Sequence, residues 1–468
     1  MDFRGPYADG APPAALAVHP PSLTAFGWRE LRRAAAIAFL GTIAVVLAVG
    51  QRLVRVGRAK GQTWAAATSA GVVDAFIALG PTFVKLGQMI ASSPSVFPKP
   101  LADACLRCLD DVPPVSAAQV RRIVAEDLGV SVDEVFKEFD DAPLSAASIA
   151  QVHACLLSDG RQAVLKIQRP AIKDRMNRDL RIMYRVARLI NRTKRGKLVN
   201  PVAVVQDLHQ VTNEELNFAL EAHRQSRFRS NISAFGDNEW ITAPEIYWDV
   251  CGPRVIAMER MYGVPLDEFE QLRARGIDGE LVLRRGVKVW MEAALVHGPF
   301  HGDVHAGNLW LLDDGRATYL DFGIMGELPP DHRDALRDAQ YTSMIDGDYT
   351  RVVRAWQRIG ILGPESEIGP VDEVAVRIKM VMEPMLDLKM GDVSLSSMMK
   401  DQLELAQEYG AQTQRELVLV TKQLMYFERY AKGLAPDYNM ARDLFLLKNV
   451  FPEAVAQACA ERAITLPT

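Results

Sequence analysis

Hydrophobic and polar positions along the chain follow two different periods. A period of two runs through PLSAASIAQVHACLLSDGRQAVLKIQR on both sides of Ser158-Asp159-Gly160, which predicts a β-hairpin with a tight turn. A second hairpin is expected where residues 309–312 and 317–320 flank Asp313-Asp314-Gly315. The helical period covers most of the rest: residues 72–109, 117–128 after an N-cap at Ser116, 171–233, 281–297, and nearly everything from 324 to about 463. The pattern predicts an α+β fold with small sheets and a large helical C-terminal part.

The N-terminal region has a different character. Residues 1–24 are rich in Pro, Ala and Gly and are expected to be disordered. Residues 34–50 then carry no charge over 17 positions and are flanked by arginines, and residues 1–60 hold eight Lys/Arg against three Asp/Glu. Three interpretations stay open: a helix inserted in the bilayer, a helix lying on an anionic membrane surface, and a soluble core helix. Membrane association is the favoured expectation.

The overall composition excludes several classes of protein. The chain has 468 residues and a formal net charge of −4, without a basic stripe, so no nucleic-acid partner is expected. Five cysteines form no disulfide framework, which favours a reducing compartment. Cys105 and Cys108 form a CxxC, but no second pair completes a zinc site, so we expect buried helix cysteines there.

The chemistry concentrates in FHGDVHAGNLWLLDDGRATYLDFG, residues 300–323. Asp303 and Asn308 stand in D-x-x-x-x-N, the spacing of a kinase catalytic loop, and Asp321-Phe322-Gly323 follows the second hairpin. Asp303 would orient the phosphate acceptor, while Asn308 and Asp321 would bind Mg²⁺ through oxygen. His301 and His305 could be read as a metal pair, but a third ligand is missing, so His301 is expected to brace the loop.

Phosphoryl transfer also needs positive charge on the phosphates. Lys166, in AVLKIQRP at the end of the first hairpin, resembles the kinase strand lysine that contacts the α- and β-phosphates. Glu221 is the expected partner that positions Lys166. Where protein kinases carry a glycine-rich phosphate loop, this chain has Ser145-Ala146-Ala147-Ser148. Because alanine does not adopt positive φ freely, this loop should hold nucleotide phosphates in another pose.

These motifs carry a family resemblance. PLSAASIAQVH, the K-x-G-Q stretch with Lys85 and Gln88, and HGDVHAGN with DFG resemble the UbiB family of atypical protein-kinase-like proteins, also called ABC1 or ADCK, from about residue 83 to 326. The resemblance implies a bilobal kinase-like fold that binds ATP with Mg²⁺ and supports ubiquinone or other isoprenoid-lipid pathways. It makes Lys85 and Gln88 residues of a lid over the active site.

The same resemblance places the family's E-x-D motif at Glu215-Leu216-Asn217, with Glu215 pairing with Lys85. Asn217 departs from the usual Asp, which puts any metal or proton role at this position in doubt. Residues 255–261, VIAMERM, are expected to form a strand and an interlobe hinge. Met258 would be the gatekeeper, and backbone groups near Glu259 and Met261 would contact adenine.

Four segments are expected from this resemblance: a disordered start with an apolar helix (1–60), a helical lid extension (61–138), an N-lobe (139–262) and a helical C-lobe (263–468). No A-P-E segment follows DFG, which argues against an ordinary protein kinase. The sequence predicts an atypical kinase or ATPase at a membrane, with its catalytic part in the cytoplasm and isoprenoid-lipid biosynthetic enzymes as possible partners. Two alternatives remain: a non-catalytic or slow-ATPase nucleotide sensor that organises a membrane complex, and a small-molecule kinase similar to aminoglycoside or choline kinases, which lack the K-x-G-Q lid.

Overall fold

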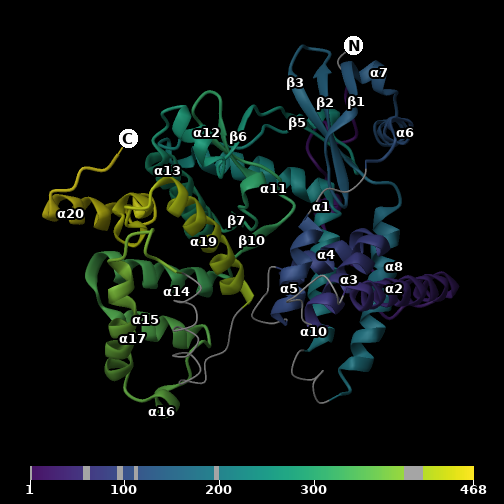
Figure 1. Cartoon of the computed structure of the whole chain (residues 1–468). Coiled ribbons are helices and arrows are strands. Elements are labelled where there is room, and N and C mark those ends of the chain that lie inside the picture. The colour runs from purple at the N-terminus through teal and green to yellow at the C-terminus, as the bar shows by residue number, and fades with distance from the viewer. Residues whose placement is uncertain are drawn as a thin grey trace. The chain divides into compact units, whose positions relative to one another are not determined.

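The computed structural model describes residues 3–55, 64–91, 98–109, 114–193, 200–394 and 415–467 (Figure 1). The chain forms two compact units. Unit 1 comprises residues 1–222 and 246–260, and unit 2 comprises residues 223–245 and 261–468. The mixture of long helices with short, mostly antiparallel strands confirms the predicted α+β class. The four-segment division stays a prediction.

Unit 1 is built on a four-stranded sheet in the order β1-β2-β3-β5, antiparallel throughout. Its strands are β1 (Phe136–Ala146), β2 (Ala150–Leu157), β3 (Gln162–Gln168) and β5 (Val255–Glu259). The predicted first hairpin is β2–β3, and Gly160 adopts the positive φ of 90° that its turn requires. Lys166 lies opposite Val152 on one side and Ile256 on the other, so it belongs to a central strand.

Unit 1 also contains many helices. They are α1 (Pro13–Leu16), α2 (Trp28–Arg55), α3 (Trp64–Leu79), α4 (Pro81–Ala91), α5 (Lys99–Cys105), α6 (Ala117–Leu128), α7 (Val132–Val135), α8 (Ile172–Ile190), α10 (Pro201–Glu215) and the first part of α11 (Phe218–Ile232), with short 3₁₀ turns η1 (Leu106–Leu109) and η3 (Trp248–Val250). Helix α6 begins after Ser116 and ends at Gly129 in the left-handed conformation, as the sequence predicts. One core lies between the sheet and α6, α7 and α11, and a second lies among α3, α4, α8 and α10.

Residues 3–25 are ordered against the rest of unit 1. The Gly5 N–H donates to the Asp249 carbonyl at 2.7 Å, and the Tyr7 N–H donates to the Cys251 carbonyl at 3.2 Å. Tyr7 itself is buried. The prediction of disorder for residues 1–24 is therefore wrong over its described part, because backbone hydrogen bonds and one buried aromatic ring anchor the segment. We call residues 3–25 the N-terminal strap.

Helix α2 contains the uncharged stretch 34–50. Over the described parts of the chain, no helix is long and apolar enough to cross a membrane. One face of α2 packs on unit 1 through Ile37 and Leu40. The opposite face leaves Trp28, Phe39 and Val46 more than half exposed, at 70%, 66% and 61%.

Unit 2 contains two small sheets and many helices. One sheet has the order β4-β9-β8-β6 and the other pairs β10 with β7. The strands are β4 (Ile241–Thr242), β6 (Gly263–Pro265), β7 (Pro299–His301), β8 (Leu309–Leu312), β9 (Ala317–Tyr319) and β10 (Met325–Glu327). The second predicted hairpin is β8–β9, but the short strand β10 lies where the pattern predicted helix.

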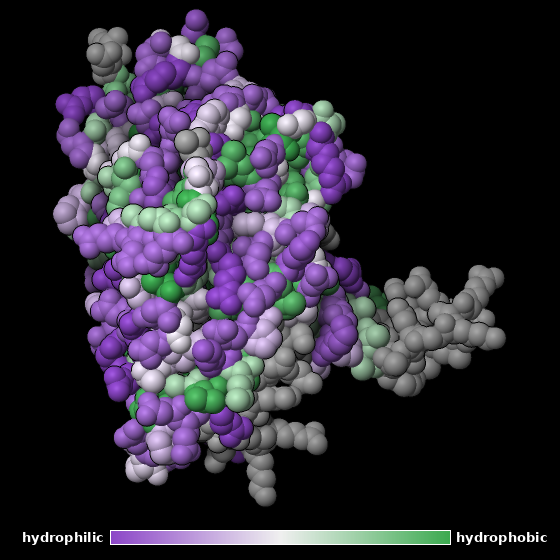
Figure 2. Space-filling view, turned by 90° about the vertical axis from the view of Figure 1, so that its left-hand side faces the viewer, coloured by the Kyte–Doolittle hydropathy of each residue, from purple (hydrophilic) through white to green (hydrophobic). Residues whose placement is uncertain are grey.

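The helices of unit 2 enclose one large hydrophobic core and smaller satellites. They are the rest of α11, α12 (Phe269–Ala274), α13 (Gly279–Glu292), α14 (Pro330–Tyr341), α15 (Tyr349–Arg358), α16 (Glu365–Ile368), α17 (Val371–Leu386), α19 (Arg415–Leu434) and α20 (Pro452–Arg462), with π-helices η4 (Ala293–His297) and η6 (Thr342–Asp346) and 3₁₀ turns η2 (Ser233–Phe235), η5 (Ala306–Asn308), η7 (Met440–Arg442) and η8 (Leu444–Leu447). On the face drawn in Figure 2, hydrophobic side chains form small groups among hydrophilic ones.

Candidate functional site

Unit 1 carries a buried ion pair at the expected position. Lys166 Nζ on β3 lies 2.5 Å from Glu221 Oε1 on α11, and their side chains are only 9% and 1% exposed. The lysine also lies 5.7 Å from the centre of the Phe218 ring. Burying two charges is costly unless they are paired, so this geometry fixes both side chains against each other. A strand lysine pointing into solvent is excluded. The contact of Lys166 with phosphates stays a prediction.

A second ion pair belongs to the K-x-G-Q motif on α4. Lys85 pairs with Glu215 at the end of α10, and both side chains are nearly buried. The Gln88 side chain donates to the Cys108 carbonyl at 3.0 Å. Gly87 lies against Cys108, where an added Cβ would meet Sγ at 2.4 Å. The motif thus joins α4 to α10 and to η1, and its glycine allows the close approach. Its role as a lid stays a prediction.

Asn217 has a role that the sequence did not reveal. Its Oδ1 accepts a hydrogen bond from the Leu220 N–H at 3.1 Å, in the manner of an N-cap for α11. Its Nδ2 donates to the Ala15 carbonyl of the N-terminal strap at 2.8 Å. An aspartate could make the first bond but not the second. The asparagine that stands in place of the family's usual aspartate therefore supplies the donor for this contact with the strap.

The Ser-Ala loop connects β1 to β2. Ser145 and Ala146 end β1 opposite Val152 and Gln151, and Ala147 N–H donates to the Ala150 carbonyl at 2.8 Å to close the turn around Ser148. The Arg169 Nε–H donates to the Ala147 carbonyl at 2.8 Å. The arginine side chain therefore fixes the Ala147 carbonyl in a loop that contains no glycine. Contact of the loop with a nucleotide stays a prediction.

The predicted adenine-binding stretch is split by the boundary of the units. Met258 and Glu259 end β5 in unit 1, opposite Val164 and Ala163 on β3, while Met261 begins unit 2. Met258 is buried, as a gatekeeper would be. Adenine contacts here stay a prediction.

In unit 2 a catalytic-type loop follows β7. His301 is fully buried, its Nε2 lies 2.9 Å from the Leu320 carbonyl oxygen, and its Nδ1 accepts from the Asp303 N–H at 3.2 Å. Burial lowers the pKa of His301, so the ring is neutral. These contacts fit the bracing role and leave no ring nitrogen directed at a metal. His305 is 44% exposed, and its Nδ1 accepts from the Gly307 N–H at 3.0 Å.

Asn308 and Asp321 lie close to that loop. The Asn308 Nδ2 donates to the Asp303 carbonyl at 3.0 Å, which leaves its Oδ1 as the side-chain atom suited to a cation. The Leu320 N–H donates to the Asn308 carbonyl at 2.8 Å, so the β8–β9 hairpin returns the chain to the loop. Asp321 has a left-handed φ of 53°, a strained conformation that recurs at functional sites. Phe322 is fully buried and anchors this turn.

Helix α19 contributes three side chains that the sequence analysis missed. Lys422 Nζ lies 2.9 Å from Asp303 Oδ1. Gln423 accepts from the Val304 N–H at 2.9 Å and donates to the Gly302 carbonyl at 2.8 Å, while the Tyr430 hydroxyl donates to the Val304 carbonyl at 2.7 Å. No local motif marks these residues. The available signal is the polar pair Lys422-Gln423 inside the apolar run LVLVTKQLMYF.

The charge state of Asp303 follows from these neighbours. Burial would raise the pKa of its carboxyl group, but the positive charge and hydrogen bond of Lys422 outweigh that effect and lower the pKa. The carboxylate is ionised at neutral pH and can accept a proton or a hydrogen bond. This is the state that an acceptor-orienting group needs.

Within the described ranges, no three His, Cys, Asp or Glu side chains gather into a metal cluster. The oxygens of Asn308 and Asp321 nevertheless suit Mg²⁺, which usually takes one or two protein ligands and completes its shell with phosphate oxygens and water. The residues present therefore fit a magnesium ion that arrives with a nucleotide. They do not fit a permanent all-protein metal cage.

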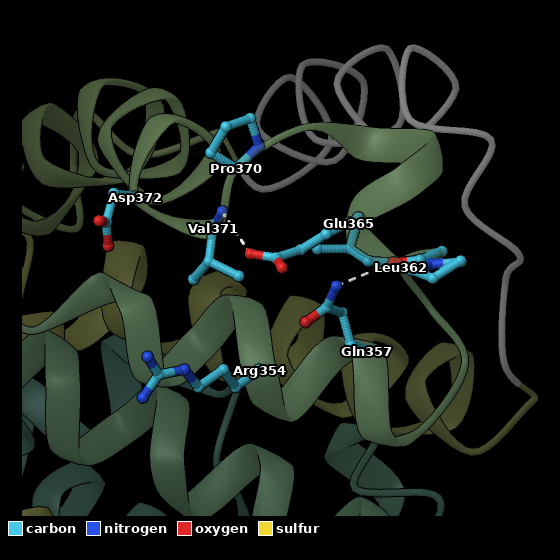
Figure 3. A pocket seen from close by; sticks show the side chains of 9 residues that line it. Arg354, Gln357, Leu362, Glu365, Pro370, Val371 and Asp372 are labelled. Carbon is cyan, nitrogen blue, oxygen red and sulfur yellow. Dashed lines mark hydrogen bonds between the residues drawn. The ribbon is translucent and has the colours of Figure 1, made fainter.

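A separate pocket lies in unit 2 among α15, α16 and α17 (Figure 3). Arg354 and Gln357 line it from α15, and Glu365 and Asp372 line it from the opposite side. Gln357 Nε2 donates to the Gly363 carbonyl at 3.0 Å, and Glu365 accepts from the Val371 N–H at 3.2 Å. None of the predicted site residues lines this pocket. Some polar side chains of the pocket already form hydrogen bonds to nearby backbone groups, so we assign the pocket no ligand.

Comparison with known proteins places these motifs in context. The model of the ABC1 atypical kinase-like domain matches residues 107–356, and that of the UbiB helical domain matches residues 378–439. An uncharacterized protein of Mycobacterium tuberculosis is 35% identical over 92% of this chain and 84% of its own length. A probable protein kinase UbiB of Aeromonas hydrophila is 32% identical over 83% of this chain and 72% of its own length.

Among solved structures, a Mycobacterium tuberculosis protein in complex with erythromycin is 22% identical, with a TM-score of 0.47, over 75% of this chain and 92% of that one.

Proposed function

Because the chain belongs to the family of ABC1 atypical kinase-like proteins and carries a UbiB helical domain, we propose that it is an ATP-binding, Mg²⁺-dependent kinase or ATPase. We further propose that it supports isoprenoid quinone or other lipid metabolism at a membrane surface. The observation that carries the enzymatic part is the buried Lys166–Glu221 ion pair. A buried lysine paired with the Glu221 carboxylate presents a fixed positive charge, which is what nucleotide phosphates require.

The groups of unit 2 supply the remaining parts of such a reaction. Asp303 is ionised and lies in the loop that the buried His301 fixes. In this proposal Asp303 hydrogen-bonds the hydroxyl of the acceptor, or a water, and takes its proton. Asn308 and Asp321 would hold Mg²⁺, which when bound neutralises charge on the phosphates and orients them. The Lys85–Glu215 pair would restrict what reaches the phosphates, as a lid does.

The membrane part of the proposal rests on α2 and the helix next to it. The outward face of α2 exposes Trp28, Phe39 and Val46, and the end of α8 exposes Leu189 and Ile190 at 61% and 47%. Exposed apolar side chains of this size mark interaction surfaces when they gather. Exposed arginines on the two helices add attraction to anionic lipid: Arg29, Arg32, Arg185 and Arg188. The surface-lying interpretation of residues 34–50 fits these observations.

The test is ATP turnover by the full chain in the presence of Mg²⁺, with and without vesicles containing anionic lipid. Asp321→Asn should abolish turnover, whereas Asp331→Asn, at an exposed position of α14, should leave it unchanged. Binding of ATP without release of phosphate under every condition would instead favour the nucleotide-sensor alternative. Equal activity of wild type and Asp321→Asn would refute the magnesium role.

Vesicle binding tests the membrane part on its own. Phe39→Glu places a charge on the outward face of α2 and should reduce sedimentation with anionic vesicles without changing the affinity for nucleotide. Phe235→Glu is the matched control, because Phe235 is a partly exposed phenylalanine, at 38%, in unit 2. Equal vesicle binding by the two variants would contradict the assignment of this surface.

A further inference from the structure

Lys422 and Asp303 form an ion pair that no short sequence motif predicts. The lysine lies on α19, 119 positions after the aspartate. Both side chains keep some access to solvent, at 29% and 20% exposure. An ion pair that keeps access to solvent adds only modest stability, so stability alone gives a weak reason for this arrangement. The contact concerns the one carboxylate that the proposed reaction uses to receive a proton.

The lysine is carried by a helix that is fixed to the loop on both sides of Asp303. Gln423 bonds to the residues before and after the aspartate, Gly302 and Val304, and Tyr430 adds a third bond to Val304. Gln423 and Tyr430 are fully buried. The position of Lys422 relative to Asp303 is therefore set by the surrounding structure rather than by the flexible lysine stem alone.

Unit 2 also contains a lysine that shows what a structural ion pair looks like in this fold. Lys288 is 1% exposed and is bonded by Glu292 at 2.9 Å, Asp237 at 3.1 Å and Asn238 at 2.7 Å. Its charge is enclosed by protein groups. Lys422, by contrast, keeps part of its side chain accessible beside a reactive carboxylate. Its ammonium can exchange a hydrogen bond to Asp303 for one to a ligand.

We propose that Lys422 is a further catalytic residue, whose ammonium contacts the terminal phosphate of ATP and stabilises the charge that develops on it. This inference rests on the proposed phosphotransfer function. An acceptor hydroxyl bonded to Asp303 lies about 3 Å from the carboxylate, and its oxygen must come within about 3–3.5 Å of phosphorus. A group already bonded to Asp303 is therefore within reach of the phosphoryl oxygens.

A bond forms between the acceptor oxygen and the terminal phosphorus, and the bond from that phosphorus to the bridging oxygen breaks. The bridging electron pair leaves with ADP, and the acceptor proton passes to Asp303. Lys422 keeps its proton and donates hydrogen bonds to the phosphoryl oxygens. With water as acceptor the products are ADP and inorganic phosphate.

The experiment compares Lys422→Met, which removes the charge, with Lys422→Arg, which keeps it. Lys432→Met is the control, because Lys432 lies on the same helix but pairs with Glu428 and is 40% exposed. We expect kcat of Lys422→Met to fall by about 100-fold or more, the scale for losing one charge-stabilising donor. Lys422→Arg should recover part of the lost kcat, and the kcat of Lys432→Met should match that of the wild type.

Binding gives a second readout that does not depend on turnover. A lysine that contacts the terminal phosphate should make a non-hydrolysable ATP analogue bind about 10-fold more tightly than ADP, through one charge-assisted contact. Lys422→Met should reduce this preference to about 2-fold, while Lys432→Met should retain it. A merely structural lysine would lower both affinities together and leave their ratio intact.

These readouts separate the two hypotheses. An unchanged affinity ratio and unchanged kcat in Lys422→Met would overturn the assignment of Lys422 and leave the proposed function standing. If the wild type binds nucleotide but does not turn it over, the enzymatic proposal fails, and the affinity ratio alone decides the role of Lys422. If Lys422→Met does not fold, Lys422→Arg and Lys422→Gln are compared in its place. Absence of nucleotide binding by the folded wild type would overturn both.

Discussion

Asn217 joins the start of α11 to the N-terminal strap by donating from its side-chain amide to the backbone carbonyl of Ala15, at 2.8 Å. The same side chain accepts from the Leu220 N–H at 3.1 Å. One amide group therefore fixes the helix that carries Glu221 to a segment about 200 positions earlier. Only a side chain with both a donor and an acceptor can make the two bonds.

The Asn217→Asp variant should release the strap. A carboxylate has no donor for the Ala15 carbonyl, and an unsatisfied or repelled group at such a site costs about 1–3 kcal/mol. We expect faster hydrogen exchange of the strap amides, those of Gly5 and Tyr7 above all. Hydrogen–deuterium exchange of the full chain measures this.

A matched control exists in unit 2. Asn439 donates to the Leu386 carbonyl at 3.0 Å and accepts from the Arg442 N–H at 3.0 Å. Asn439→Asp makes the same chemical change in a similar arrangement, so it should lose similar stability without affecting exchange in the strap. Identical strap exchange in both variants would show that Asn217 does not hold the strap.

The Glu221→Gln variant should destabilise unit 1 and weaken nucleotide binding. It removes the carboxylate that lies 2.5 Å from the buried Lys166, and breaking a buried pair in this way costs about 3–5 kcal/mol. Chemical denaturation measures the first effect and nucleotide titration the second. In Glu292→Gln, a comparable change at the fully buried Lys288–Glu292 pair, we expect a smaller loss of stability, because Lys288 keeps Asp237 as a partner, and an unchanged affinity of the folded protein for nucleotide.

The Gly87→Ala variant should disturb the K-x-G-Q motif by steric overlap. The added Cβ would lie 2.4 Å from Cys108 Sγ, so we expect destabilisation by about 1–3 kcal/mol in thermal unfolding. Gly41→Ala on α2 meets nothing within 4 Å and should instead stabilise by up to about 1 kcal/mol. Adding Cys108→Ala removes the sulfur atom and should partly rescue Gly87→Ala. No rescue would mean that Cys108 is not the obstacle.

Folding stability should fall as the pH drops below about 7. Burial lowers the pKa of His153, His209 and His297 below the ordinary value of 6.5. The unfolded chain therefore binds protons at these positions before the folded chain does, and the stability present above pH 6.5 declines as the pH falls toward the folded-state pKa. Each tenfold difference in proton affinity corresponds to about 1.4 kcal/mol.

Urea denaturation between pH 7.5 and pH 5 measures this dependence, at about half-unit steps. The His209→Gln variant should show a shallower decline than wild type. His19→Gln, at an exposed position of the strap, serves as the control. A decline that is the same in all three proteins would assign the pH dependence to other groups.

The sequence predicted the parts of the site that lie within short motifs. Asp303, Asn308 and Asp321 are brought near one another by the local β8–β9 hairpin, so their spacing was informative. The Lys166–Glu221 contact was predictable because the family pattern carries both residues, although 55 positions separate them. Bracing of the loop by His301 also followed, because its sequence context offered no third metal ligand.

Long-range contacts without a motif could not be predicted in this way. In the sequence, Lys422 looks like any other polar residue of an amphipathic helix. Only the tertiary structure brings it next to Asp303. The composition of residues 1–24, rich in Pro, Ala and Gly, predicts disorder for the strap. Its order comes from backbone hydrogen bonds and from Tyr7, and backbone hydrogen bonds leave no compositional trace.

The position of the strap also constrains the order in which unit 1 can be completed during synthesis. Gly5 bonds to Asp249 and Tyr7 to Cys251, so these two residues must wait during synthesis for partners made almost 250 positions later. At about 5–20 residues per second, that wait is on the order of tens of seconds. During it, Tyr7 and the apolar surface that receives it stay uncovered, a period in which a chaperone or membrane surface could engage the nascent chain.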